Sequence, residues 1–186
     1  MRWFRKRDDN EPLPVAMAGV RLGNRLLAVV SADPSLIADL ARKTGLTGRV
    51  CVVEPDSGRA AHAAAAIERA GALVETIAEP WGALPLDADS FDVAVARDVL
   101  HTMAPDVRVR CLADVFRLLR SGGRIVVIEP AAPSGLSSML SRTHVDPGYY
   151  GQGGATYALT SAGFAAVRVI AERDGVIYAE GAKRAD

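Results

Sequence analysis

The sequence has 186 residues, of which 49% are hydrophobic and 24% charged, so it is long enough for one domain with a full core. The 22 basic residues balance the 22 acidic residues, and this zero formal net charge argues against a nucleic-acid partner held by bulk charge. The sequence contains no apolar run of membrane-spanning length, and residues 1–10 lack the apolar core of a signal peptide, so we expect a cytoplasmic protein.

The N-terminal segment differs in composition from the rest of the chain. Residues 1–7 hold four basic and two aromatic side chains. Such a segment is either a frayed, solvated terminus or a weak contact with an anionic membrane surface. Pro12 and Pro14 indicate a linker, so the predicted division is a basic tail and linker at 1–14 and a single domain at 15–182.

The clearest strand–turn–helix unit runs from Leu26 to Gly45. Residues 26–30 form an apolar run of strand length, typical of a strand buried on both faces of a parallel sheet. Asp33 is predicted to cap the following helix and Pro34 to be its first residue, where a missing N–H has no cost. Gly45 is predicted to end the helix.

The rest of the chain alternates strand and helix patterns. We expect helices at 15–20, 57–70, from Pro105 to about 119, and at 156–163, and further strands at 49–53, 73–77, 91–96, 124–129, 166–172 and 176–180. The Asp174-Gly175 pair between the last two strands is a hairpin signal. This order predicts a Rossmann-like, doubly wound, seven-stranded α/β sheet that is parallel except for its last strand.

The two cysteines, Cys51 and Cys111, lie in an apolar strand and on the apolar side of a helix. Both are therefore expected to be buried, and neither a disulfide nor a metal site is predicted. The arginines of the same helix, Arg108 among them, lie mostly off its apolar stripe and are expected to form a solvated face.

Three segments carry a family resemblance. Residues 84–101 contain a Leu-Pro turn, then Ser-Phe-Asp at the start of a buried strand, and then a Leu-His pair. Residues 118–130 have a Gly-Gly entry into a strand, and Ala162-Gly163-Phe164 precedes the penultimate strand. In this order and spacing the segments resemble class I S-adenosylmethionine-dependent methyltransferases, of the small subgroup related to ubiquinone and menaquinone biosynthesis enzymes, over residues 15–182.

This resemblance implies a binding site for S-adenosylmethionine. Glu54, which ends an otherwise apolar strand, would accept hydrogen bonds from the ribose hydroxyls of the cofactor, as an acidic residue at the end of the second strand of such a sheet can do. The other implied contacts are Pro55 at the ribose and adenine, the loop of Glu79, Pro80 and Trp81 at the adenine, and Ala96 and Arg97 at the methionine part.

The first turn departs from the family pattern, which is an acidic residue followed by Gly-x-Gly-x-Gly. The four positions hold Ala28, Val30, Ala32 and Pro34, so the acidic residue and all three glycines are missing. Glycine allows a positive φ and a close approach of backbone to ligand. The implied cofactor turn therefore consists of Val30, Ser31, Ala32 and Asp33, where Ser31 is small and polar and Asp33 adds a negative charge close to the methionine part.

His101 is the candidate catalytic base, because it follows the fourth strand at the mouth of the expected crevice and many acceptors must lose a proton. It is equally consistent with a residue at a helix start that moves no proton. His144, Asp146, Tyr149 and Tyr150 lie in a long loop that either binds the acceptor or packs on itself. His62 is expected at the surface.

Three functions remain open at this point. The first is a methyltransferase that acts on a small-molecule acceptor, as a monomer or a homodimer. The second is a degenerate methyltransferase-like domain that has lost the cofactor and serves as a binding or scaffold partner. The third, a nicotinamide-dinucleotide domain, requires a Gly-x-Gly-x-x-Gly motif that is absent. The first two differ in whether a pocket remains beside Val30 and Glu54.

Overall fold

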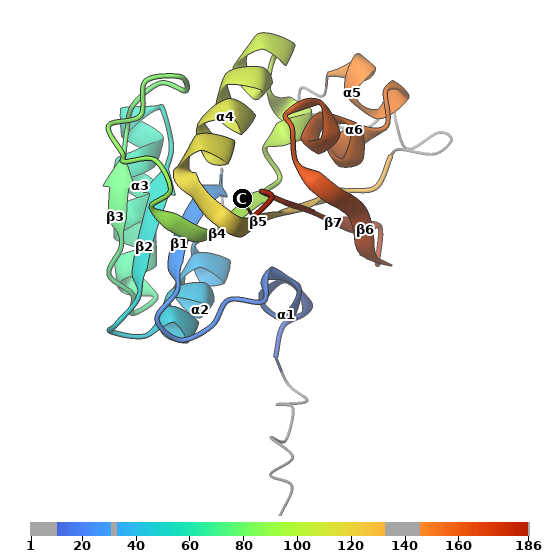
Figure 1. Cartoon of the computed structure of the whole chain (residues 1–186). Coiled ribbons are helices and arrows are strands. Elements are labelled where there is room, and N and C mark those ends of the chain that lie inside the picture. Colours follow the sequence, from blue (N-terminus) through green and yellow to red (C-terminus); the bar gives the residue numbers. More distant parts are fainter. Residues whose placement is uncertain (1–10, 31–32, 133–145, 186) are drawn as a thin grey trace, which may run out of the picture.

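A computed structural model of the chain describes residues 11–30, 33–132 and 146–185. Its strands are β1 (Arg25–Val30), β2 (Arg49–Val53), β3 (Glu75–Ile77), β4 (Phe91–Arg97), β5 (Leu119–Pro130), β6 (Ala165–Arg173) and β7 (Val176–Ala182). They form one sheet in the order β3-β2-β1-β4-β5-β7-β6 (Figure 1). Only β7 runs against the others, pairing antiparallel with both β5 and β6. The predicted seven-stranded sheet with its reversed last strand is confirmed.

Helices cover both faces of this sheet. They are α1 (Leu13–Ala18), α2 (Pro34–Thr44), α3 (Ser57–Arg69), α4 (Pro105–Leu118), α5 (Pro147–Gly151) and α6 (Gly154–Ser161), with a 3₁₀ helix, η1 (Leu100–Thr102), between β4 and α4. In Figure 1, α1 and α2 lie below the sheet, and α4 and α6 lie above it. Within the described ranges, none of these helices has the length and apolar character needed to cross a membrane.

The core has one layer on each face, as the alternation of side chains along buried strands requires. Leu27 and Val29 of β1 pack in the layer beneath α4, and Leu26 and Ala28 pack in the layer beneath α2. Cys51 and Cys111 are both buried, as predicted, and both are free thiols. Burial raises the pKa of the Cys51 thiol to about 12, and it raises that of Cys111 as well.

The β1–α2 unit forms as its sequence predicts. The Asp33 carboxylate accepts a hydrogen bond from the Leu36 backbone N–H at 2.9 Å, and Pro34 is the first helical residue. Gly45 follows the last turn with a φ of +64°, a conformation that favours glycine, and its N–H bonds to the Ala41 carbonyl.

Several boundaries differ from the expected ones. The third strand begins at Glu75 rather than at residue 73, since Leu73 is 87% exposed and contributes nothing to the core. The first helix begins at Leu13, inside the predicted linker, and α5 lies in the predicted long loop. The prediction for residues 1–7 falls outside the described residues.

One expectation about α4 is wrong. Arg108, expected on a solvated face, is only 8% exposed. Its guanidinium donates to the Leu100 carbonyl at 3.0 Å and to the Asp146 carboxylate at 2.7 Å. It also lies over the Tyr149 ring, at 4.6 Å from the centroid. A buried guanidinium needs such partners, and here they come from η1 and from the segment that begins α5.

Candidate functional site

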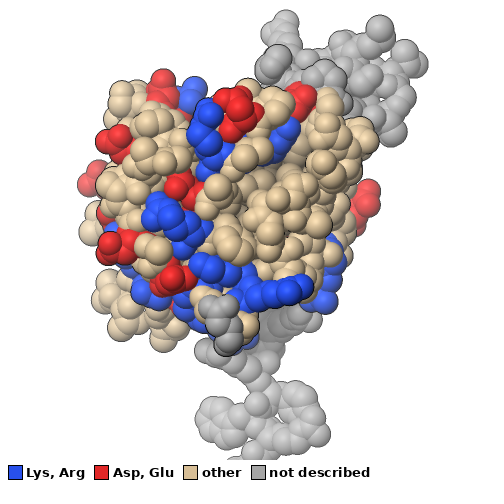
Figure 2. Space-filling model, turned by 45° about the horizontal axis from the view of Figure 1, so that its top comes forward, with Lys and Arg blue, Asp and Glu red and all other residues tan. Residues whose placement is uncertain are grey.

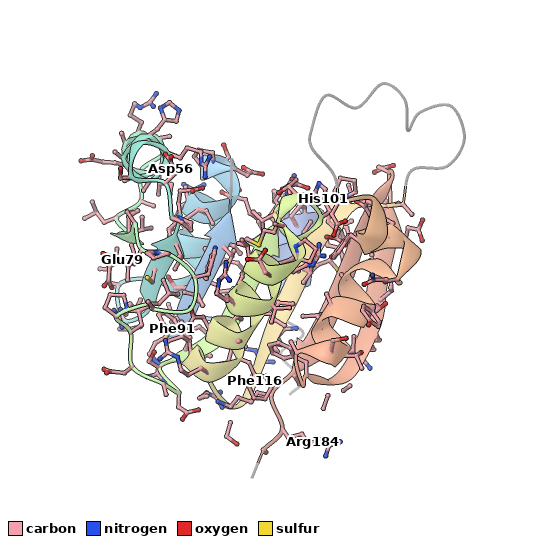
Figure 3. All side chains as sticks on the ribbon, turned by 90° about the horizontal axis from the view of Figure 1, so that it is seen from above. Asp56, Glu79, Phe91, His101, Phe116 and Arg184 are labelled. Carbon is pink, nitrogen blue, oxygen red and sulfur yellow. The ribbon has the colours of Figure 1, made fainter. Side chains whose placement is uncertain are left out.

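The carboxyl ends of β1, β2, β4 and β5 lie at one edge of the sheet, which we call the carboxyl edge. Figure 3 shows Asp56, after β2, and His101, after β4, near this edge, while Phe91 at the start of β4 and Arg184 after β7 lie toward the opposite edge. Open sheets of this kind bind ligands in a crevice outside the carboxyl ends of the strands, where the strand order reverses. Here the order reverses between β1 and β4.

A cavity of about 590 Å³ opens at this edge on the α4 side of the sheet. Its walls come from β1, β2, η1, α4 and the loop after β3, and its lining includes the predicted residues Glu54, Pro55, Pro80 and Trp81. The volume lies within the range of small-molecule sites, roughly 300–1,000 Å³. Four of the five residues predicted at the ribose and adenine therefore meet around one hollow.

Glu54 is held in place by the turn that follows it. The side chain is buried, with 5% of its surface exposed. Its Oε1 atom accepts hydrogen bonds from the Asp56 backbone N–H at 3.0 Å and from the Arg59 guanidinium at 2.9 Å. Within the described part of the chain, no hydrogen bond reaches Oε2. One carboxylate oxygen is thus fixed by the protein, and the other can accept a bond from a ligand.

Trp81 is fixed by contacts between its loop and α4. The Asp114 carboxylate accepts a hydrogen bond from the Gly82 backbone N–H at 2.5 Å, and Arg117 donates to the Leu86 carbonyl at 2.7 Å. Trp81 is 6% exposed and forms part of the cavity wall. Glu79, by contrast, is exposed and does not line the cavity (Figure 3). The loop therefore presents an aromatic wall rather than a carboxylate.

The residues predicted at the methionine end lie on two sides of the sheet. Ala96 is buried in the layer beneath α4, on the same side as the cavity. Arg97 points to the α2 side, where its guanidinium lies 3.4 Å from the Asp33 carboxylate. Ser31, Ala32 and the side chain of Val30 fall outside the described residues, although the Val30 backbone pairs with β4 opposite Arg97. The Asp33–Arg97 ion pair thus joins the first turn to the end of β4.

His101 lies beside the cavity wall, in η1, but its side chain is directed toward the end of β5. The side chain is buried, and among the described residues its Nδ1 atom has no hydrogen-bond partner. Nδ1 lies 3.8 Å from Oε2 of Glu129, which is itself 2% exposed. The Tyr149 hydroxyl donates to this carboxylate, at 2.8 Å from Oε2 and 2.9 Å from Oε1. Burial, followed by the negative charge of Glu129, raises the pKa of Tyr149, so its hydroxyl remains a donor.

We call His101, Glu129 and Tyr149 the buried polar cluster. His101 and Tyr149 are candidates from the sequence, which shows no link between them, whereas Glu129 was not predicted. A signal for Glu129 existed, because it ends the apolar run of β5 just as Glu54 ends that of β2. Of the other loop residues proposed for the acceptor, Tyr150 packs edge-to-face against Tyr149 with ring centroids 5.3 Å apart, and His144 lies outside the described residues.

Among the described residues, no group of histidine, cysteine and carboxylate side chains has the arrangement of a metal site. His62, expected at the surface, is exposed on α3. The carboxyl edge therefore offers two sets of reactive groups. One is the Glu54 carboxylate, which has one oxygen available to a ligand in the cavity, and the other is the buried pair of His101 and Glu129 beside it.

Comparison with known proteins identifies the class of this fold. The model of the methyltransferase domain family matches residues 32–127, which is more than half of the chain. The chain therefore belongs to the methyltransferase domain family, and its fold is that of class I S-adenosylmethionine-dependent methyltransferases. The resemblance inferred from the sequence is confirmed.

Individual relatives are distant. The ubiquinone/menaquinone biosynthesis C-methyltransferase UbiE of Marinomonas sp. is 28% identical over 135 residues, which cover 70% of this chain and 51% of that protein. The chain thus spans about half the length of the curated relatives it matches. A SAM-dependent methyltransferase from Aquifex aeolicus superposes with a TM-score of 0.72 at 14% identity, covering 91% of this chain and 87% of that one. The [4+2]-cyclase SpnF superposes with a TM-score of 0.67 at 16% identity, covering 94% and 79%.

Proposed function

We propose that this protein is an S-adenosylmethionine-dependent methyltransferase that acts on a small-molecule acceptor. The observation that carries the proposal is the cavity of about 590 Å³ beside Glu54. Without the family's glycines, side chains could have filled this crevice, and the domain would then be a scaffold. The cavity is instead open, at the strand-order reversal, and its lining combines an acidic residue with an aromatic wall.

The residues around the cavity suit the parts of the cofactor. Glu54 would accept a ribose hydroxyl at Oε2, and Pro55 would lie against the same ribose. Trp81 and Pro80 would border the adenine, with Glu79 at the outer end of their loop. The methionine part would lie toward the β1–α2 turn of Val30, Ser31, Ala32 and Asp33 and toward Ala96 and Arg97 at the end of β4.

The bound cofactor would supply an electrophilic methyl group on a sulfonium. The protein would contribute alignment of the acceptor with that methyl group and exclusion of water, which can remove much of the barrier of a two-reactant step. His101 would serve as the base for an acceptor that must lose a proton.

A second function, a domain without the cofactor, is favoured by two observations. Arg59 already occupies Oε1 of Glu54, and the first turn lacks every glycine of the family pattern. In addition, SpnF, which has a similar fold, is named as a [4+2]-cyclase, so the fold alone does not define the reaction.

Calorimetric titration of the protein with S-adenosylmethionine and with S-adenosylhomocysteine separates the two functions. We expect a dissociation constant of roughly 1–100 µM, about −5.5 to −8 kcal/mol, and a loss of at least about tenfold in affinity in Glu54→Gln. The matched control is Glu75→Gln, at the amino end of β3, where the carboxylate pairs with Arg49 at the surface. No heat up to millimolar ligand from a protein shown to be folded would favour the scaffold function.

A further inference from the structure

We propose that Glu129 and Tyr149 are positioning residues that hold His101 as a base, and that the acceptor therefore bears an ionisable O–H or N–H group. This inference rests on the proposed methyl transfer and adds to it the chemical class of the acceptor. It starts from an unusual feature, a buried imidazole nitrogen that has no hydrogen-bond partner in the described ranges and lies beside a buried carboxylate.

The Nδ1–Oε2 distance of 3.8 Å is too long for a hydrogen bond but within reach of one. An approach of about 1 Å would form an Nδ1–H···Oε2 bond, and such bonds at catalytic sites are often long before ligands bind. Glu129 is the carboxylate that this nitrogen faces. An ionised carboxylate accepts hydrogen bonds and cannot donate them. Glu129 would therefore place the single proton of the neutral imidazole on Nδ1 and leave Nε2 as an acceptor.

The second ring nitrogen is placed differently from the first. Nδ1 is fully enclosed, and within the described ranges no hydrogen bond reaches Nε2. Because the two nitrogens point in different directions from the ring, Nε2 is directed away from Glu129. In this proposal Nε2 would be the atom that takes the proton of an acceptor bound beside η1, at the edge of the cavity.

The rest of the cluster fixes this arrangement. Tyr149 holds the Glu129 carboxylate through its hydroxyl. The turn that carries His101 is held by Arg108, which donates to the Leu100 carbonyl at 3.0 Å, and by the Asp146 backbone N–H, which donates to the His101 carbonyl at 2.9 Å. A base whose orientation depends on packed neighbours and a second layer of hydrogen bonds is preorganised for proton transfer.

Nε2 of His101 takes the proton of the acceptor O–H or N–H, and the acceptor atom forms a bond to the methyl carbon. The carbon–sulfur bond of the cofactor would break with its electron pair left on sulfur, so that the positive charge of the sulfonium would pass to the His101 imidazolium. Glu129 stabilises that imidazolium through Nδ1–H, as a carboxylate does beside a catalytic histidine.

The first test needs no cofactor. The ¹⁵N chemical shifts of the His101 imidazole, assigned by their loss in His101→Gln, report the tautomer at about pH 8, above the ordinary titration range of histidine. We expect the Nδ1–H tautomer in the wild-type protein and a shift toward Nε2–H in Glu129→Gln, because an amide can donate to Nδ1. Glu172→Gln, on the exposed strand β6, is the control and should leave the shifts unchanged. A wild-type protein with mainly the Nε2–H tautomer would overturn the proposal, whether or not Glu129→Gln folds.

The second test uses kinetics with phenol-like and amine acceptors and distinguishes the two proposals. We expect kcat to fall about 10²–10⁴-fold in His101→Gln and about tenfold or more in Glu129→Gln, with S-adenosylhomocysteine affinity within about twofold of the wild type. If the wild type binds neither S-adenosylmethionine nor S-adenosylhomocysteine, the proposed function fails and the base role fails with it. If the wild type binds them but kcat is unchanged in both variants, only the role of the buried polar cluster is wrong.

Discussion

The two edges of the sheet use similar charged residues in different ways. At the amino edge, where the parallel strands begin, the Asp92 carboxylate accepts from the Arg25 backbone N–H at 2.7 Å and from Arg120 at 2.6 Å. Lys183 bonds there to the Asp89 carboxylate at 2.8 Å and to the Leu119 carbonyl at 2.7 Å. Figure 2 shows basic and acidic side chains adjacent to one another on the side of the molecule that includes this edge.

At the carboxyl edge the pairing is incomplete. Glu54 keeps one oxygen without a partner in the described part of the chain, and the His101 Nδ1 atom has none. Buried polar groups are normally satisfied, so unsatisfied ones mark places where something else is to bind or where the structure tightens during function. With the proposed function, the amino edge would contribute chiefly to stability and the carboxyl edge to ligand binding.

The largest effect on stability is expected from Tyr149→Phe. This change removes the hydroxyl that holds Glu129 and leaves a buried carboxylate without its donor, at a cost of about 2 kcal/mol. The midpoint of thermal unfolding should fall by about 4–8 °C for a chain of this size. The control is Tyr150→Phe, whose hydroxyl bonds to the Pro130 carbonyl at an exposed position and whose loss should shift the midpoint much less. Equal shifts in the two variants would show that Glu129 does not depend on Tyr149.

A smaller effect is expected at the amino edge from Asp92→Asn. Partial burial would raise the pKa of Asp92, but the hydrogen bonds from Arg25 and Arg120 outweigh it and the pKa is lowered. A lowered pKa in the folded state adds stability that is present above the unfolded value of about 3.9 and is lost as the pH falls through the folded value. We expect the variant to lose roughly 1 kcal/mol near pH 7 and the difference from wild type to shrink below about pH 4.

Urea unfolding at several pH values measures the difference in unfolding free energy between Asp92→Asn and the wild type. Titration of the same two proteins with S-adenosylhomocysteine tests whether the change affects the carboxyl edge. Binding should be unchanged in Asp92→Asn. A weakened affinity with an unaltered unfolding curve would reverse the roles that we assign to the two edges.

The smallest effect on stability is expected from Arg59→Ala. The side chain of Arg59 is 65% exposed, so the loss of its ion pair with Glu54 should change stability by less than about 0.5 kcal/mol. Because the change frees Oε1 for a second ribose hydroxyl, affinity for S-adenosylhomocysteine should rise about two- to fivefold, which corresponds to roughly 0.4–1 kcal/mol. Calorimetric titration of the wild type and of Arg59→Ala with S-adenosylhomocysteine measures this change in affinity. A fall in affinity would mean that Arg59 itself contacts the ligand.

Much of the fold could be predicted because local signals and burial agree along the chain. Residues 49–53 are a strand in both the sequence analysis and the structure, and the Asp33 cap and Gly45 end of α2 follow from local chemistry alone. The third strand was predicted too long because apolar character at Leu73 does not show whether a neighbouring strand covers it.

The candidate site could be predicted only in part. Glu54 stands out because it ends an apolar strand, and the loop with Trp81 follows from the family resemblance. The buried polar cluster could not be predicted, because Glu129 and Tyr149 are 20 residues apart and meet only when α5 folds over the end of β5. The burial of Arg108 depends on the same contact between distant segments.

The position of β7 has a consequence for folding during synthesis. β7 follows β6 in the chain but lies between β5 and β6 in the sheet, so β6 has no strand partner until residues 176–182 have been made. Until then β5 presents its unpaired edge, and an open strand edge is a template for pairing with other chains. The half of the sheet beyond β5 can therefore close only late in translation, and ribosome-bound chains that stop before Val176 should be prone to aggregation.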